Sequence, residues 1–133
     1  MSNMTRRTLL RDGSLATSAA TLLPAGLTKA AEAEEAEAAI FHVFVFHWKP
    51  ETTQAQIDRA TTVIRAFQGV IPGLLETHVG ANISPHAKGY TFGGVMQFKS
   101  KVALDAYVQH PAHQALLSWL VPLIEPIELD LYA

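Results

Sequence analysis

The stretch Ile40-Phe-His-Val-Phe-Val-Phe-His-Trp48 decides the fold of this chain. It is rich in aromatic and β-branched residues, a composition typical of a β-strand. Side chains alternate between the two faces of a strand. One face therefore carries His42, Phe44, Phe46 and Trp48. The opposite face carries Phe41, Val43, Val45 and His47. Because both faces are largely apolar, the sequence predicts a strand that is buried on both sides.

The chain after this segment alternates helical and strand patterns. A capping box formed by Thr53 and Gln56 predicts a helix that runs to about Gln68. Strand patterns over 74–83 and 90–99 follow, and Gly93-Gly94 inside the second predicts close backbone packing or a bulge. Ser100 is a good N-cap for a helical region that extends past Pro111 to about residue 120. A last strand is predicted over 127–132, so the order is β-α-β-β-α-β, the ferredoxin-like α+β unit.

The doubly apolar first strand also predicts self-association. Two main helices can cover only one face of a four-stranded sheet, and the chain has no spare element for the other face. A second copy of the sheet is the simplest cover, so we expect a homodimer whose two sheets form an α/β barrel.

Composition and charge exclude several classes of function. The chain has 133 residues, with 10 Lys and Arg against 12 Asp and Glu, and it has no cysteine. Near-balanced charge without a basic stripe argues against a nucleic-acid partner. The absence of cysteine excludes disulfides, thiolate metal sites and a cysteine nucleophile. No apolar run reaches the roughly 18 residues that a membrane span needs.

The first 38 residues read as an export signal rather than as part of the fold. Thr5-Arg6-Arg7 followed by Thr8-Leu9-Leu10 resembles the twin-arginine (Tat) motif, and a weakly apolar stretch covers 13–27. Small residues then frame two candidate cleavage sites, after Ala33 and after Ala38. We therefore expect residues 1–38 to be the Tat signal peptide and cleavage region, and 39–133 to be the mature domain. The partner would be the Tat machinery, and the destination periplasmic or otherwise extracytoplasmic.

Several motifs from Ile40 to the C-terminus resemble one known family. They are Phe41-His42-Val43, Ile71-Pro72-Gly73, Gly80-Ala81-Asn82-Ile83-Ser84, Gln97-Phe98-Lys99-Ser100, the run from Ala103 to His113, and Asp130. The most specific piece is Tyr107-x-x-His110-Pro111-x-His113. Together they are similar to the stress-responsive dimeric α/β-barrel (Dabb) domain. The resemblance implies a ferredoxin-like protomer, a dimeric barrel, and a pocket between sheet and helices in each protomer.

The family includes plant stress and antimicrobial proteins and a plant polyketide cyclase, and the cyclase suggests roles for three residues. The resemblance implies that His113 is a general base, that Tyr107 assists it, and that His42 lines the same pocket. An imidazole suits removal of a carbon-bound proton, and a phenol suits stabilisation of an enolate oxygen. This chain departs from the cyclase at Phe92, which stands where the cyclase has a pocket histidine.

Three functions remain open from the sequence. The leading one is a homodimer that binds a small apolar or aromatic ligand, without a metal or other cofactor. The residues predicted to contact that ligand are His42, Phe44, Phe46, Phe92 and His110. The second is a cyclase-like lyase that uses His113 and Tyr107. The third is a haem-dependent or metal-dependent oxygenase, but Pro111 disturbs the helical spacing of His110 and His113 as metal ligands. The sequence leaves open whether Glu128 faces the pocket, and whether Tyr107 and His113 meet.

Overall fold

The computed structural model describes residue 26 and residues 29–31 and 38–133. Arg6, Arg7 and the cleavage site after Ala33 lie outside the described residues, so the predicted export signal stays a prediction. Within the described ranges, no helix combines the length and the apolar character required to cross a membrane.

The observed elements follow the predicted order. They are β1 (Ile40–Trp48), α2 (Gln54–Ala66), β2 (Leu74–Ala81), β3 (Phe92–Phe98), α3 (Lys101–Gln109), α4 (Pro111–Leu120), the short 3₁₀ helix η1 (Val121–Leu123) and β4 (Ile124–Tyr132). The last strand begins three residues before the predicted start at Ile127. The strand can include Pro126, because β4 is an edge strand, where a missing N–H donor is tolerated.

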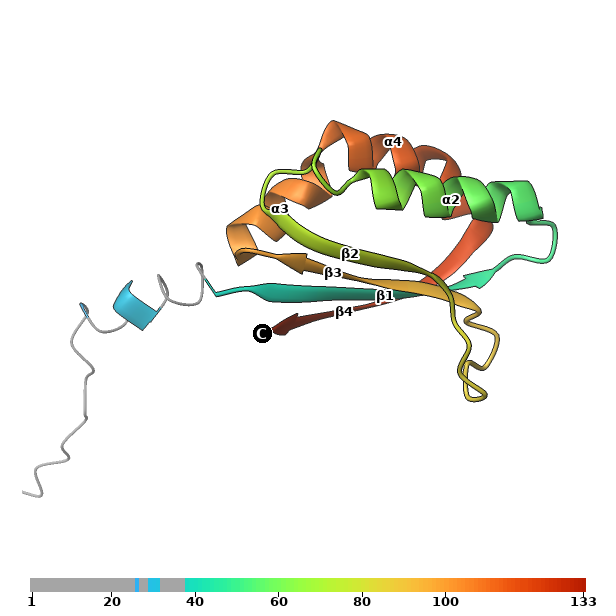
Figure 1. Ribbon diagram of the computed structural model, residues 1–133, viewed down its shortest axis with the longest axis horizontal. Coiled ribbons are helices and arrows are strands. Elements are labelled where there is room, and N and C mark those ends of the chain that lie inside the picture. The colour runs from blue at the N-terminus through green and yellow to red at the C-terminus, as the bar shows by residue number, and fades with distance from the viewer. Residues whose placement is uncertain (1–25, 27–28, 32–37) are drawn as a thin grey trace, which may run out of the picture.

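The four strands form one antiparallel sheet in the order β2-β3-β1-β4. Figure 1 shows α2, α3 and α4 together on one side of this sheet, while its other face is left uncovered. This is the ferredoxin-like α+β arrangement that the sequence predicted, with β1 in the interior of the sheet between β3 and β4.

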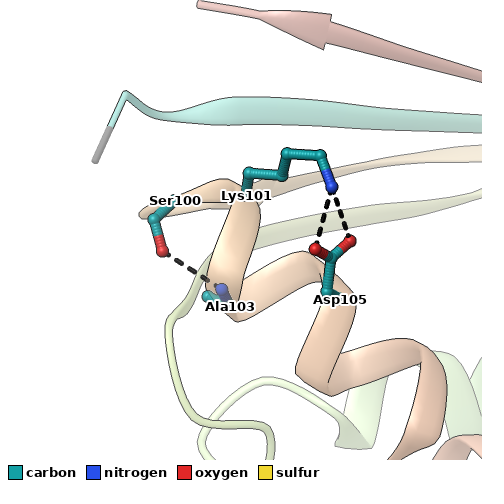
Figure 2. Close-up of polar contacts among 4 residues, drawn as sticks. All are labelled: Ser100, Lys101, Ala103 and Asp105. Atoms are coloured by element: carbon teal, nitrogen blue, oxygen red, sulfur yellow. Dashed lines mark hydrogen bonds and ion pairs between the residues drawn. The ribbon is translucent and has the colours of Figure 1, made fainter. Parts of the chain in front are cut away.

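Local capping explains where the helices begin. The Thr53 side chain accepts a hydrogen bond from the Gln56 N–H at 3.2 Å, and the Thr53 N–H donates to the Gln56 side chain at 2.9 Å. These two bonds are the predicted capping box. At α3 the Ser100 hydroxyl accepts from the Ala103 N–H at 3.1 Å (Figure 2). Lys101 and Asp105 pair across the next turn of that helix.

The core lies between the sheet and the three helices. Its largest fully buried side chains are Phe92, Phe98, Met96 and Leu120. Gly94 has a packing role here, because a side chain there would overlap the Phe44 ring and lie 2.6 Å from the His78 carbonyl oxygen. The close backbone packing predicted for Gly93-Gly94 is therefore confirmed.

The face of the sheet away from the helices is apolar and open, and we call it the open face. Its apolar side chains are Phe41, Val43, Val45, Val95, Ile127, Leu129 and Leu131. A strand usually turns its apolar side chains towards the helices that cover the sheet. In β4 the apolar side chains instead point away from the helices, and Glu128 and Asp130 point towards them. A strand oriented in this way leaves its apolar face uncovered within one protomer.

Candidate functional site

A cavity of about 110 Å³ lies between β1 and the helices and is the candidate site. β1 contributes His42, Phe44 and Phe46, whose alternation places them on the helix side. Tyr107 comes from α3, and the remaining lining residues are Ile64, His113, Leu116, Leu117, Leu120, Val121, Ile124, Pro126 and Glu128. The cavity therefore has a largely apolar wall with a few polar side chains, as ligand sites commonly do.

The junction between α3 and α4 brings Tyr107 and His113 together. His110 adopts an extended conformation (φ −64°, ψ 137°), which ends α3, and Pro111 occupies the first turn of α4. The chain turns at this point, so two residues six positions apart face each other with ring centroids at 4.2 Å. The contact that the sequence left open is thus formed in the structure.

His113 presents a free imidazole nitrogen in its neutral form. Its Nδ1–H donates to the Val108 carbonyl oxygen at 3.1 Å, since a carbonyl can only accept, and this leaves the lone pair on Nε2. Burial lowers the pKa of His113, and the nearby His42 lowers it further. The Val108 hydrogen bond and Glu128 act in the opposite direction but do not outweigh burial. The ring is therefore neutral near pH 7 and can accept a proton.

Tyr107 lines the same cavity, and its phenol is protonated. The residue is only 4% exposed, and burial raises the pKa of its phenol well above the usual value, with a smaller contribution from Glu128. Within residues 38–133 its hydroxyl has no hydrogen-bond partner from the protein. Tyr107 can therefore donate a hydrogen bond to a ligand oxygen.

His42 is held in place by a carboxylate that lies 88 residues away in the sequence. Its Nδ1 is 2.6 Å from Asp130 Oδ1, and the two residues are register partners across β1 and β4. The ring also packs against Tyr107, with centroids 6.0 Å apart. Sequence reasoning had named Asp130 only through the family resemblance and did not pair it with His42. Antiparallel pairing of the first and last strands was the available signal.

Two residues predicted to contact a ligand, Phe92 and His110, do not line the cavity, and the position of Glu128, which the sequence left open, is now decided. Phe92 does not line the cavity, because it is fully buried and stacks behind Phe46 at 5.6 Å between centroids. His110 does not line it either, because its Nδ1 accepts from the Ala112 N–H at 3.1 Å and caps α4. Glu128 lines the cavity, since it lies opposite Phe44 on the helix side of β4.

The described residues offer little for a metal. Across residues 38–133, no group of three or more His, Asp or Glu side chains is arranged to hold a metal ion. The Nδ1 atoms of His110 and His113 both interact with backbone groups. The histidine pair considered in the sequence analysis is therefore used in building the helix junction.

A second and wider hollow, of about 450 Å³, lies on the open face. It forms where Gly80 and Gly93, which are register partners on this face opposite Val45, leave the sheet without side chains. None of the converging polar groups Tyr107, His113 and Glu128 reaches it, so the smaller cavity remains the candidate for chemistry.

Comparison with known proteins agrees with this geometry. Residues 40–130 match the family model described as Stress responsive A/B Barrel Domain (Dabb). The chain belongs to the Dabb family. No curated protein sequence matches it.

Solved structures of Dabb-like proteins share the fold. A dimeric ferredoxin-like protein of unknown function from Thermobifida fusca has a TM-score of 0.65 and 25% identity, over 72% of this chain and 92% of that one. A Dabb family protein from Mesorhizobium loti has a TM-score of 0.62 and 26% identity, over 72% and 97% of the two chains. The hydroxynitrile lyase of Passiflora edulis has a TM-score of 0.67 over 73% and 94%, but at 19% identity it shows the fold alone.

The pKa of His113 predicts how the stability of this Dabb domain depends on pH. The unfolded chain protonates this imidazole near its usual pKa of 6.5, whereas the folded protein resists protonation. The unfolded state therefore binds more protons below that pH, and the free energy of unfolding falls as the pH drops through and below 6.5.

Replacing His113 with asparagine, whose amide can still donate to the Val108 carbonyl, should weaken this dependence. Urea unfolding at about pH 7.5 and about pH 5.5 measures how far the free energy of unfolding falls between the two pH values. Comparing the unmodified protein with the variant isolates the contribution of His113, because the other titrating groups are present in both. If the free energy of unfolding falls by the same amount between these pH values in both proteins, the pKa of His113 is not lowered.

Proposed function

We propose that this chain binds a small aromatic or apolar molecule in the cavity between β1 and α4. The observation that carries the proposal is the convergence of Tyr107 and His113 on a largely apolar cavity, with their ring centroids 4.2 Å apart. A purely structural corner would satisfy its polar tips with backbone, as His110 does. Tyr107, by contrast, keeps an unused donor at the cavity.

The size of the cavity limits the ligand to about one ring. At about 110 Å³ it is well below the roughly 300–1,000 Å³ that holds a drug-sized molecule. Phe44 and Phe46 stack on each other at 5.1 Å and present ring surfaces to the cavity. These surfaces favour a flat apolar group, while Tyr107 would donate to an oxygen on it.

Native mass spectrometry of the protein purified from its source cells tests this proposal. We expect the unmodified protein to carry the additional mass of a one-ring organic compound. Replacing Leu117 in the cavity wall with tryptophan should fill the cavity, so this variant should lack the additional mass. A matched change to tryptophan at Val102, which is 65% exposed and lies outside the cavity, should retain the mass. Persistence of the mass in the Leu117→Trp protein would place the ligand elsewhere.

A proton-transfer lyase is the second candidate, and the free Nε2 of His113 favours it. In the proposed step a ligand C–H bond breaks and its proton moves to Nε2. The electron pair moves to form the enolate, whose oxygen accepts a hydrogen bond from Tyr107. A neutral imidazole beside a protonated phenol is the pair of protonation states that this step requires.

We also propose that the protein is a homodimer formed through the open face. Four of its apolar side chains, Val95, Ile127, Leu129 and Leu131, are 37%, 52%, 51% and 49% exposed in the protomer. An apolar area of this kind on a sheet is commonly covered by a partner. Structural relatives from Thermobifida fusca and Jannaschia are described as dimeric ferredoxin-like proteins.

Export through the Tat pathway is the last part of the proposal, and it rests on the sequence around Arg6 and Arg7. Replacing both arginines with lysine conserves charge but removes the guanidinium pair that defines the motif. We expect the protein to remain inside the cell, as fractionation and immunoblotting would show. Lysine at position 11 instead of arginine is the control and should be exported. Unchanged export of the double-lysine protein would overturn the assignment.

A further inference from the structure

Glu128 sets the charge of the candidate cavity. It is the one Asp, Glu, Lys or Arg among the lining residues, all of which belong to the described range 38–133. Its position opposite Phe44 in the β1–β4 register directs it to the helix side of the sheet, near the edge at β4. Its charge acts on both Tyr107 and His113, so it lies close enough to influence a ligand bound between them.

The other polar groups at the cavity supply no compensating positive charge near pH 7. Burial keeps His113 neutral and Tyr107 protonated. His42 contacts the carboxylate of Asp130 at 2.6 Å, so a proton on His42 would be balanced by that partner. Lys101 pairs with Asp105 at 2.8 Å and does not line the cavity. The net charge facing a ligand is therefore negative.

From this arrangement we infer that Glu128 makes the cavity selective by charge, so that it binds neutral or cationic one-ring molecules and rejects aromatic carboxylates. The inference rests on the proposed ligand-binding function and adds the chemical class of the ligand. A carboxylate ligand would be placed near Glu128 with no Lys or Arg in the lining to pair with it. Like charges in a partly desolvated site repel, whereas a cationic ligand would gain an attraction.

Three probes of nearly the same size and shape separate charge from fit. Benzamide is neutral, benzoate is anionic and benzamidine is cationic near pH 7. Isothermal titration calorimetry with the full chain at low ionic strength should give benzoate a Kd at least about tenfold higher than that of benzamide. Benzamidine should bind at least as well as benzamide. The difference should shrink at high salt, since Glu128 is exposed and is screened by ions.

Replacing Glu128 with glutamine keeps the size of the side chain and removes its charge. In that variant the Kd values for benzoate and benzamide should agree to within about threefold. Glu51→Gln removes the same charge from an exposed position outside the cavity, and it should keep the original preference.

The possible failures of the experiment have different meanings. Equal affinity for benzoate and benzamide in the unmodified protein would overturn the charge selectivity while leaving the ligand-binding proposal intact. A preference that survives in Glu128→Gln would also overturn it, since another group would be responsible. No binding of any of the three probes would overturn both proposals.

Discussion

Replacing Leu129 with aspartate should convert the protein from a dimer to a monomer. Leu129 lies opposite Val43 on the open face and is 51% exposed in the protomer. In a dimer formed through this face the new carboxylate would be buried without a partner. An uncompensated buried charge costs roughly 3–5 kcal/mol, and a two-fold symmetric interface contains the substitution twice. We therefore expect the dimer Kd to rise more than about a hundredfold.

Sedimentation equilibrium over a range of protein concentrations measures this change. Val102→Asp is a matched control, because Val102 is a 65% exposed valine in the first turn of α3, on the helix side of the sheet. Aspartate is well tolerated near a helix N-terminus, so this variant should stay dimeric. Circular dichroism should show that both variants keep their secondary structure. A dimeric Leu129→Asp protein would mean that the open face is covered by something other than a second copy.

Removing the imidazole of His113 should have the second large effect, on proton transfer. Acetophenone is a one-ring ketone whose methyl protons exchange with deuterium through the enolate, and NMR in D₂O follows this exchange. If His113 is the base, the protein should accelerate the exchange, and His113→Ala should reduce the protein-dependent rate by roughly 10²–10⁴-fold. Tyr107→Phe should reduce it by roughly 10²–10³-fold, because the donor to the enolate oxygen is lost.

His86→Ala is the control for this experiment, since His86 is exposed in the connection between β2 and β3 and lies away from the cavity. Its rate should equal that of the unmodified protein. A His113→Ala protein that retains full exchange activity would exclude His113 as the base. A His113→Ala protein that loses exchange but still binds benzamide would show that His113 serves the chemical step and not ligand binding.

The elements that the sequence predicted correctly share a local origin. The capping box at Thr53 and Gln56 and the N-cap at Ser100 depend on residues three positions apart, so the sequence contains the whole motif. The two faces of β1 follow from the alternation of side chains along a strand. The uncovered face was predictable as well. The predicted helices can cover only one face of the sheet, whereas both faces of β1 are apolar.

Other features could not be read locally because they depend on strand register and on the angle between helices. In β4 the apolar side chains Ile127, Leu129 and Leu131 alternate with acidic ones, and either set could face the helices. Hydrogen bonding between β1 and β4 decides the matter by placing Glu128 opposite Phe44 and Asp130 opposite His42. Those contacts join segments more than 80 residues apart, and no local pattern encodes such a register.

The candidate site therefore has two origins. The sequence by itself determined the order of the elements, the helix starts, and the residue types available for chemistry, because these follow from short-range propensity and periodicity. Tertiary structure alone brought the ring centroids of Tyr107 and His113 to 4.2 Å across the Pro111 junction, and it directed the Glu128 side chain towards the cavity. Packing of α3 and α4 against the sheet sets these positions, since the free energy that orients the helices comes from the buried core they share.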